Sequence, residues 1–123
     1  MKASMSECRH VPDAAMTSPW LTIFTPTYNR AKLLPRLFRS IERQVMPGDR
    51  VEWLVIDDGS SDHTPGLLAA FAAERPDLVR HQRVANGGKH RAINRAAQLA
   101  RGDWLLVVDS DDLLADGALE HIR

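Results

Sequence analysis

The sequence has very little cysteine, no excess of charge and no long apolar run. Its 123 residues include one cysteine, Cys8, which excludes an internal disulfide and a zinc site built from cysteines, and fits a reducing compartment. Sixteen basic and sixteen acidic residues cancel, so no global field favours nucleic acid as a partner. No apolar run approaches the roughly 18 residues that a membrane-spanning helix needs.

Several common catalytic and phosphate-binding motifs are also absent. A Gly-Gly pair at 87–88 precedes Lys89 but lacks the spacing of a Walker loop, and no glycine follows the first predicted strand as the dinucleotide fingerprint requires. No Gly-x-Ser-x-Gly elbow and no Cys/His arrangement indicates covalent catalysis. The histidines show no pairing at metal-ligand spacing. Chemistry at this protein's site must therefore depend on other side chains.

Two hydrophobic periodicities alternate along the chain. Short β-branched apolar runs predict four strands, at residues 20–25, 51–56, 78–84 and 104–108. Apolar positions at helical spacing predict a helix after each strand, with apolar faces at 33–45, 67–71, 92–100 and 119–122. Such alternation predicts an α/β fold: a Rossmann-like, open, mostly parallel sheet with helices on both faces.

The last predicted strand runs directly into a cluster of carboxylates. Five apolar residues, 104–108, are followed by Asp109, Asp111 and Asp112, three acidic side chains within four positions. Neighbouring carboxylates repel, and folding gains nothing obvious from clustering them. Hard divalent cations such as Mg²⁺ or Mn²⁺ prefer carboxylate oxygens, so the cluster indicates a metal site. The alternative is a solvated acidic turn that caps the next helix through Asp111 or Asp112.

Polar segments also follow the other three predicted strands, at Thr25–Tyr28, Asp57–Asp62 and Asn86–Lys89. The carboxyl ends of parallel strands meet at one sheet edge, where open α/β sheets bind ligands. In the second segment, one carboxylate could accept a hydrogen bond from a ring N–H of a nucleobase, or the segment could be only a turn rich in capping residues. The glycines of the third segment, before a helix and beside a lysine, suit a phosphate.

With these segments assembled, the chain resembles the family-two glycosyltransferases of the GT-A fold. Four pieces carry the resemblance, in the same order and spacing: Thr25–Arg30, Val55–Asp62, Asn86–His90 with Ala92 and Asn94, and the DxD region Asp109–Asp112. Together they span about residues 20–123. The resemblance implies a glycosyltransferase that takes a nucleotide-diphosphate sugar, commonly a UDP-sugar, together with Mn²⁺ or Mg²⁺.

The resemblance also assigns roles to individual residues. It implies that the nucleotide-sugar is held by Thr25, Pro26, Thr27, Tyr28, Asp57, Asp58, Lys89 and Asp109. It implies that the metal is held by Asp111, with Asp109 and Asp112. The implied acceptor is a saccharide or a lipid-linked molecule, as in the synthesis of cell-surface polysaccharides.

The sequence also predicts the domain boundaries. Residues 1–19 are expected to form a disordered leader, since 1–18 contains no continuous apolar core for a signal peptide. Residues 20–123 are expected to form the nucleotide-sugar-binding half of an enzyme that is truncated at its C-terminus. Family members are typically more than twice as long, so the carboxylate that deprotonates the acceptor is expected beyond residue 123.

A half-domain is expected to expose an apolar face where its other half packs, which predicts self-association or poor solubility. The expected location is cytoplasmic, peripheral to the inner face of the membrane.

Two other functions are alternatives to a glycosyltransferase. A nucleotidyltransferase-like domain would need a glycine-rich basic loop after the first strand, which is missing. A non-catalytic or degenerate α/β nucleotide-binding module would keep the fold without the metal chemistry.

Overall fold

A computed structural model describes residues 9–10, 19–46 and 48–122 of the chain. The strands are β1 (Arg9–His10), β2 (Leu21–Thr27), β3 (Val51–Asp57), β4 (Val79–Arg83) and β5 (Trp104–Val107). The helices are α1 (Leu34–Glu42), α2 (Thr64–Glu74), α3 (Lys89–Leu99) and α4 (Ala118–Ile122). Each predicted strand and helix is present. The longest helices have 11 residues, and none in the described part of the chain could span a bilayer.

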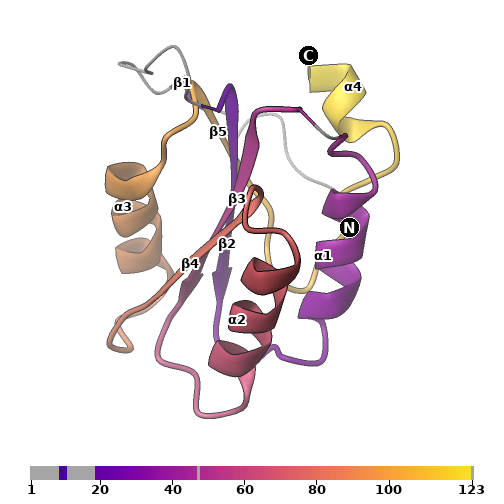
Figure 1. Ribbon diagram of the computed structural model, residues 1–123. Coiled ribbons are helices and arrows are strands. Elements are labelled where there is room, and N and C mark those ends of the chain that lie inside the picture. Colours follow the sequence, from indigo (N-terminus) through magenta and orange to yellow (C-terminus); the bar gives the residue numbers. More distant parts are fainter. Residues whose placement is uncertain (1–8, 11–18, 47, 123) are drawn as a thin grey trace.

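The strands form one sheet in the order β1-β5-β2-β3-β4. Strands β5, β2, β3 and β4 are mutually parallel, and β1 pairs antiparallel with β5 at one edge. Helices α1 and α2 lie on one face of the sheet and α3 on the other (Figure 1). The predicted open, mostly parallel sheet with helices on both faces is therefore confirmed.

Strand β1 lies within residues 1–19. That segment was expected to be a disordered leader, but Arg9 and His10 pair with Leu105 and Trp104 of β5. A two-residue strand carries no periodic pattern, so the sequence gives no signal for it. The rest of the expected leader, residues 1–8 and 11–18, lies outside the described residues.

The core has two layers, one on each face of the sheet. On the α1/α2 face, Phe38 stacks between Trp53 and Phe71, with ring centroids 5.8 and 4.3 Å apart. On the opposite face, Ala92 and Ala96 of α3 are fully buried against a smaller apolar cluster. Their small side chains let α3 lie close to the sheet, which brings its N-terminal end near the strand ends.

Strand β2 runs two residues further than predicted, through Pro26 and Thr27. A proline was expected to end the strand because it cannot donate a ladder hydrogen bond. The Phe24 carbonyl accepts a hydrogen bond from the Val108 N–H at 2.8 Å, so the backbone of Phe24 faces β5. Pro26 lies two residues further along the strand, so its backbone nitrogen also faces the β5 side. The β2–β5 pairing ends at Phe24, so no donor is missing there. Strands β2 and β5 therefore separate at their carboxyl ends.

A buried carboxylate cross-links the opposite, amino-terminal ends of the strands. Glu52 of β3 accepts hydrogen bonds from the Thr22 hydroxyl at 2.6 Å and from the Arg101 N–H at 2.7 Å. Its other oxygen lies 2.6 Å from the Arg80 guanidinium of β4. Because Thr22 also accepts from the Gly102 N–H, one cluster joins β2, β3, β4 and the turn before β5.

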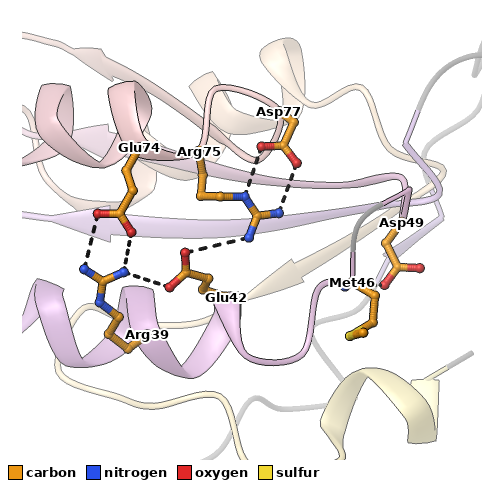
Figure 2. Close-up of polar contacts among 7 residues, drawn as sticks. All are labelled: Arg39, Glu42, Met46, Asp49, Glu74, Arg75 and Asp77. Carbon is orange, nitrogen blue, oxygen red and sulfur yellow. Dashed lines mark hydrogen bonds and ion pairs between the residues drawn. The ribbon is translucent and has the colours of Figure 1, made fainter.

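Exposed ion pairs join α1 to α2 on the surface (Figure 2). Arg39 contacts Glu42 at 2.7 Å and also contacts Glu74, and Arg75 contacts Asp77 at 3.0 Å and Glu42 at 3.8 Å. Hydrogen bonds from these arginines hold the pKa of Glu74 and of Asp77 below its ordinary value. Arg39, Glu74 and Asp77 are about half exposed or more, and Arg75 and Glu42 are partly exposed, so water screens this network and its contribution to stability is small.

The exposed large apolar side chains among the described residues are Tyr28, Met46 and Trp104. Tyr28 follows the carboxyl end of β2, whereas Trp104 begins the parallel strand β5, so these two lie at opposite ends of the sheet. They form no continuous apolar face in the described part of the chain. Self-association therefore stays a prediction.

Candidate functional site

A pocket of about 350 Å³ opens where β2 and β5 separate. This is the point at which strand order reverses, because β2 leads to β3 on one side and lies beside β5 on the other. Crevices at such points bind ligands in open α/β sheets. The pocket is lined by Pro26, Thr27, Tyr28, Arg30, Asp58, Ala92, Asp109, Ser110 and Asp111.

The loop after β2 is fixed to the loop after β3. Asn29 has a positive φ of 51°, which asparagine tolerates better than most residues, and its side-chain oxygen accepts from the Ser61 N–H at 2.8 Å. Its own N–H donates to the Ser60 hydroxyl at 2.8 Å. The Ala31 N–H donates to Asp62 at 3.3 Å. These contacts hold the β2 side of the pocket, including Tyr28, in place.

Asp57 is buried and does not line the pocket. One of its carboxylate oxygens accepts from the Ser60 N–H at 3.0 Å, and the other lies 4.0 Å from Arg83. Asp62 accepts from the N–H and the hydroxyl of Thr64, and the hydroxyl is the main reason why its pKa is lowered. Both aspartates therefore make turn contacts of the kind that the alternative interpretation of this segment predicts, and a role of Asp57 in nucleotide binding stays a prediction.

Asp58, by contrast, is a buried carboxylate that lines the pocket. Its two oxygens accept from the N–H groups of Gly87 at 2.8 Å and Gly88 at 3.0 Å. The N–H groups that suited a phosphate in the sequence are thus bound to Asp58. Gly59 follows with a φ of 74°, and a Cβ there would lie 3.0 Å from the Asn86 backbone nitrogen. The Asp58–Gly59 turn and the Gly-Gly loop therefore pack as one unit.

The three aspartates after β5 lie together. One carboxylate oxygen from each of Asp109, Asp111 and Asp112 lies within 4.8 Å of the others. Asp109 and Asp111 face the pocket, whereas Asp112 is buried, and its Oδ1 has no hydrogen-bond partner among the described residues. Burial raises the pKa of Asp112, and the charges of Asp111 and Asp109 raise it further. An oxygen donor set with an orphaned buried oxygen fits a hard divalent cation.

Without metal, the charge of Asp112 is a cost to the fold, because it is buried beside two like charges. We expect Asp112→Asn to raise the melting temperature of metal-free protein by a few degrees. We also expect it to reduce the further rise that Mn²⁺ produces in the wild-type chain. Differential scanning fluorimetry with and without Mn²⁺ measures both effects. A metal-free variant less stable than wild type would show that the ionised carboxylate stabilises this turn.

The pocket contains some predicted site residues and not others. Pro26, Thr27, Tyr28, Asp58, Asp109 and Asp111 line it, and the buried Thr27 hydroxyl has no hydrogen-bond partner among the described residues. Thr25 is buried outside it and accepts from the Trp53 indole at 2.9 Å. Lys89 begins α3, but its side chain lies outside the described part of the structure.

Three lining residues were not predicted as site residues: Arg30, Ala92 and Ser110. Each lies inside one of the four matched segments, so position within a segment was the available signal. Ala92 is the clearest case, because it lines the pocket as a small residue of a helix packed against the sheet.

The chain is similar to known glycosyltransferases over most of its length. The family model described as glycosyl transferase family 2 matches residues 22–122. A beta-monoglucosyldiacylglycerol synthase from Trichormus variabilis is 33% identical over 106 residues, which are 85% of this chain and 23% of that protein. A PGL/p-HBAD biosynthesis glycosyltransferase from Mycobacterium tuberculosis is 37% identical over 99 residues, 80% of this chain and 38% of that protein.

Solved structures show the same fold. A mannosyltransferase from Pyrobaculum calidifontis, in complex with GDP-Man and Mn²⁺, superposes with a TM-score of 0.74 at 32% identity and covers 87% of this chain. S. aureus TarS residues 1–349, in complex with UDP-GlcNAc, superposes with a TM-score of 0.74 at 30% identity and covers 83%. The chain covers 33% and 29% of these two structures, and so spans about a quarter to two fifths of the proteins it matches.

Proposed function

The chain belongs to glycosyl transferase family 2 and has the GT-A fold, and we propose that its pocket binds a nucleotide-diphosphate sugar together with a divalent cation. The observation that carries the proposal is the meeting of Asp58, Asp109 and Asp111 in one pocket. These carboxylates directly follow β3 and β5, and the segment at the end of β2 and the loop after it line the rest of the pocket. The reaction proposed for the whole protein is transfer of the sugar to an acceptor hydroxyl.

In this proposal Asp58 holds the nucleobase. Its carboxylate already accepts two backbone N–H groups, at 2.8 and 3.0 Å, which fix its orientation. A carboxylate has about four acceptor positions, so it can still accept a ring N–H from a base. Tyr28 is about half exposed at the pocket mouth and can cover a planar ring, while Asp109 is assigned to the ribose.

Asp111 and Asp112, with Asp109, are assigned to the cation. When bound, Mn²⁺ or Mg²⁺ would neutralise the negative charge that develops on the nucleoside diphosphate as the glycosyl bond breaks. The protein contributes the arrangement of oxygens, with Asp111 at the pocket wall and Asp112 beneath it. The cation in the mannosyltransferase complex is Mn²⁺, which supports this assignment.

The base, sugar and acceptor are finer parts of the proposal. We propose a uridine nucleotide, which is supported by the TarS complex with UDP-GlcNAc. The main alternative is a guanosine nucleotide, because the mannosyltransferase complex contains GDP-Man. We propose a saccharide or lipid-linked acceptor for cell-surface polysaccharide synthesis, in the cytoplasm at the inner face of the membrane. A relative named for a diacylglycerol product supports the lipid-linked choice.

Calorimetric titration of the 123-residue chain with UDP, with and without Mn²⁺, tests the proposal. We expect UDP to bind only when Mn²⁺ is present, and more tightly than GDP. Tighter binding of GDP would overturn the choice of base but leave the site intact. A folded chain that binds neither diphosphate in Mn²⁺ would favour a non-catalytic module, and turnover of UTP would favour a nucleotidyltransferase.

A further inference from the structure

Positive charge is concentrated in the part of the chain that forms β4, the Gly-Gly loop and α3. Residues 78–102 contain six arginine or lysine residues and no aspartate or glutamate, although charges balance over the whole chain. Two of the six act inside the fold, since Arg80 pairs with buried Glu52 and Arg83 lies 4.0 Å from buried Asp57. Arg91 and Arg95 make no ion pair with a carboxylate among the described residues, and neither lines the nucleotide pocket.

This charge lines a second concave surface, which we name the arginine groove. Strand β4 is the edge of the sheet, and α3 packs over β3 and β2, so the α3 side of β4 is left open (Figure 1). The groove has a volume of about 580 Å³ and is lined by Gln82, Arg83, Val84, Ala85, Arg91, Asn94, Arg95 and Gln98. It shares no lining residue with the nucleotide pocket.

The α3 wall of the groove is polar along one helical stripe. Arg91, Asn94, Arg95 and Gln98 stand at positions i, i+3, i+4 and i+7, so they lie on the same side of the helix. Their stripe runs beside the one that carries the buried Ala92. Three arginines and three amide side chains line the groove with no carboxylate among them.

Neutral groups hold Arg95, and Arg83 has a neutral acceptor in addition to its 4.0 Å ion pair with Asp57. The Arg95 guanidinium donates to the Gln82 side-chain oxygen at 2.8 Å and to that of Gln98 at 3.2 Å. Arg83 donates to the Ser60 carbonyl at 2.9 Å. Arg91 has no hydrogen-bond or ion-pair partner among the described residues, and its side chain lies over Gly87, where a Cβ would be 2.6 Å from its Cδ. Arg91 and Arg95 therefore present cations to the groove that pair with no carboxylate among the described residues, whereas Arg83 is paired with Asp57.

We propose that the arginine groove binds a phosphate-bearing ligand, as a second anion site separate from the nucleotide pocket. Planar guanidinium groups match phosphate oxygens with paired hydrogen bonds, and the side-chain amides of Gln82, Asn94 and Gln98 add neutral donors. The phosphate can belong to a soluble phosphate ester or to a lipid headgroup, since both offer the same chemistry. This proposal does not depend on nucleotide binding.

The test uses the ¹⁵N-labelled chain without nucleotide or metal. Inorganic phosphate is titrated at low salt while the side-chain N–H signals of Gln82, Asn94 and Gln98, which line the groove in every variant, are followed by NMR. We expect saturable shifts of these signals, and binding at least tenfold weaker in R91Q/R95Q, because charged donors make stronger hydrogen bonds than neutral ones. The matched control is R36Q/R43Q, which removes two exposed arginines outside the groove, one in α1 and one directly after it, and should bind phosphate like wild type.

Sedimentation with phosphatidylglycerol vesicles, against phosphatidylcholine vesicles, identifies the source of the phosphate. Vesicle binding that R91Q/R95Q loses and R36Q/R43Q keeps assigns the groove to a lipid headgroup. A phosphate response without vesicle binding assigns it to a soluble ester. The single variant R91Q, which removes no hydrogen bond or ion pair within the described part of the protein, is the control for misfolding of the double variant. Equal binding of both probes by groove variant and control, or no response to either, would overturn the proposal.

Discussion

Asp111→Asn is expected to remove Mn²⁺-dependent nucleotide binding while leaving the fold intact. Asp111 is exposed at the pocket wall and shares a cluster of oxygens within 4.8 Å with Asp109 and Asp112. Loss of a residue that only orients a metal ligand weakens metal binding roughly 10- to 100-fold, so loss of a direct ligand should weaken it at least as much. Calorimetry with UDP in Mn²⁺ measures the loss.

The same substitution should not lower the melting temperature, because it removes one of three clustered negative charges. The matched control is Asp116→Asn, which makes the same change of charge on a side chain that is 90% exposed and does not line the pocket. It should bind UDP and Mn²⁺ like wild type. Metal-dependent UDP binding at wild-type strength in Asp111→Asn would show that the cation is held without this carboxylate.

The order of elements could be predicted from periodicity alone, but the exact strand ends could not. Pro26 predicts the end of a strand, yet β2 continues through it because β5 has already ended on that side. Which neighbour ends first is a property of the assembled sheet. The two residues of β1 show the same limit, since they become a strand only by pairing with β5.

The candidate site was predictable as a group of segments and less so residue by residue. Asp57 and Asp58 are neighbours in the chain, and the sequence assigns both to the nucleotide. Their side chains leave the end of β3 on different sides, so Asp58 lines the pocket and Asp57 is buried outside it. Arg30, Ala92 and Ser110 line the pocket for the complementary reason, because their positions depend on how the loops and α3 pack.

Contacts between distant segments carried no sequence signal at all. Glu52 lies in an otherwise apolar strand, where an acidic side chain predicts a position that faces solvent. In the fold it is 3% exposed, and its partners Thr22, Arg80 and Arg101 lie 30, 28 and 49 positions away. A carboxylate with this many partners is a structural residue, which leads to the prediction with the largest effect on stability.

Glu52→Ala is expected to lower the free energy of unfolding by about 3–5 kcal/mol, the usual cost of breaking a buried ion pair from one side. The substitution leaves the Arg80 guanidinium without its carboxylate and orphans the Thr22 hydroxyl and the Arg101 N–H. Glu52→Gln keeps the shape and an acceptor oxygen, so it should be less destabilising. Urea unfolding followed by tryptophan fluorescence measures both variants.

Glu42→Ala is the matched control, since it removes a glutamate whose arginine partners lie on the surface (Figure 2). The Glu42 side chain is 25% exposed against 4% for Glu52, so water screens its ion pairs more and its effect should be several-fold smaller. The comparison separates burial from charge, because the residue type and the change are the same. Equal losses in Glu42→Ala and Glu52→Ala would show that the Glu52 cluster is no stronger than a surface ion pair. A selective loss in Glu52→Ala would show that this cluster holds together the ends of the strands opposite the pocket.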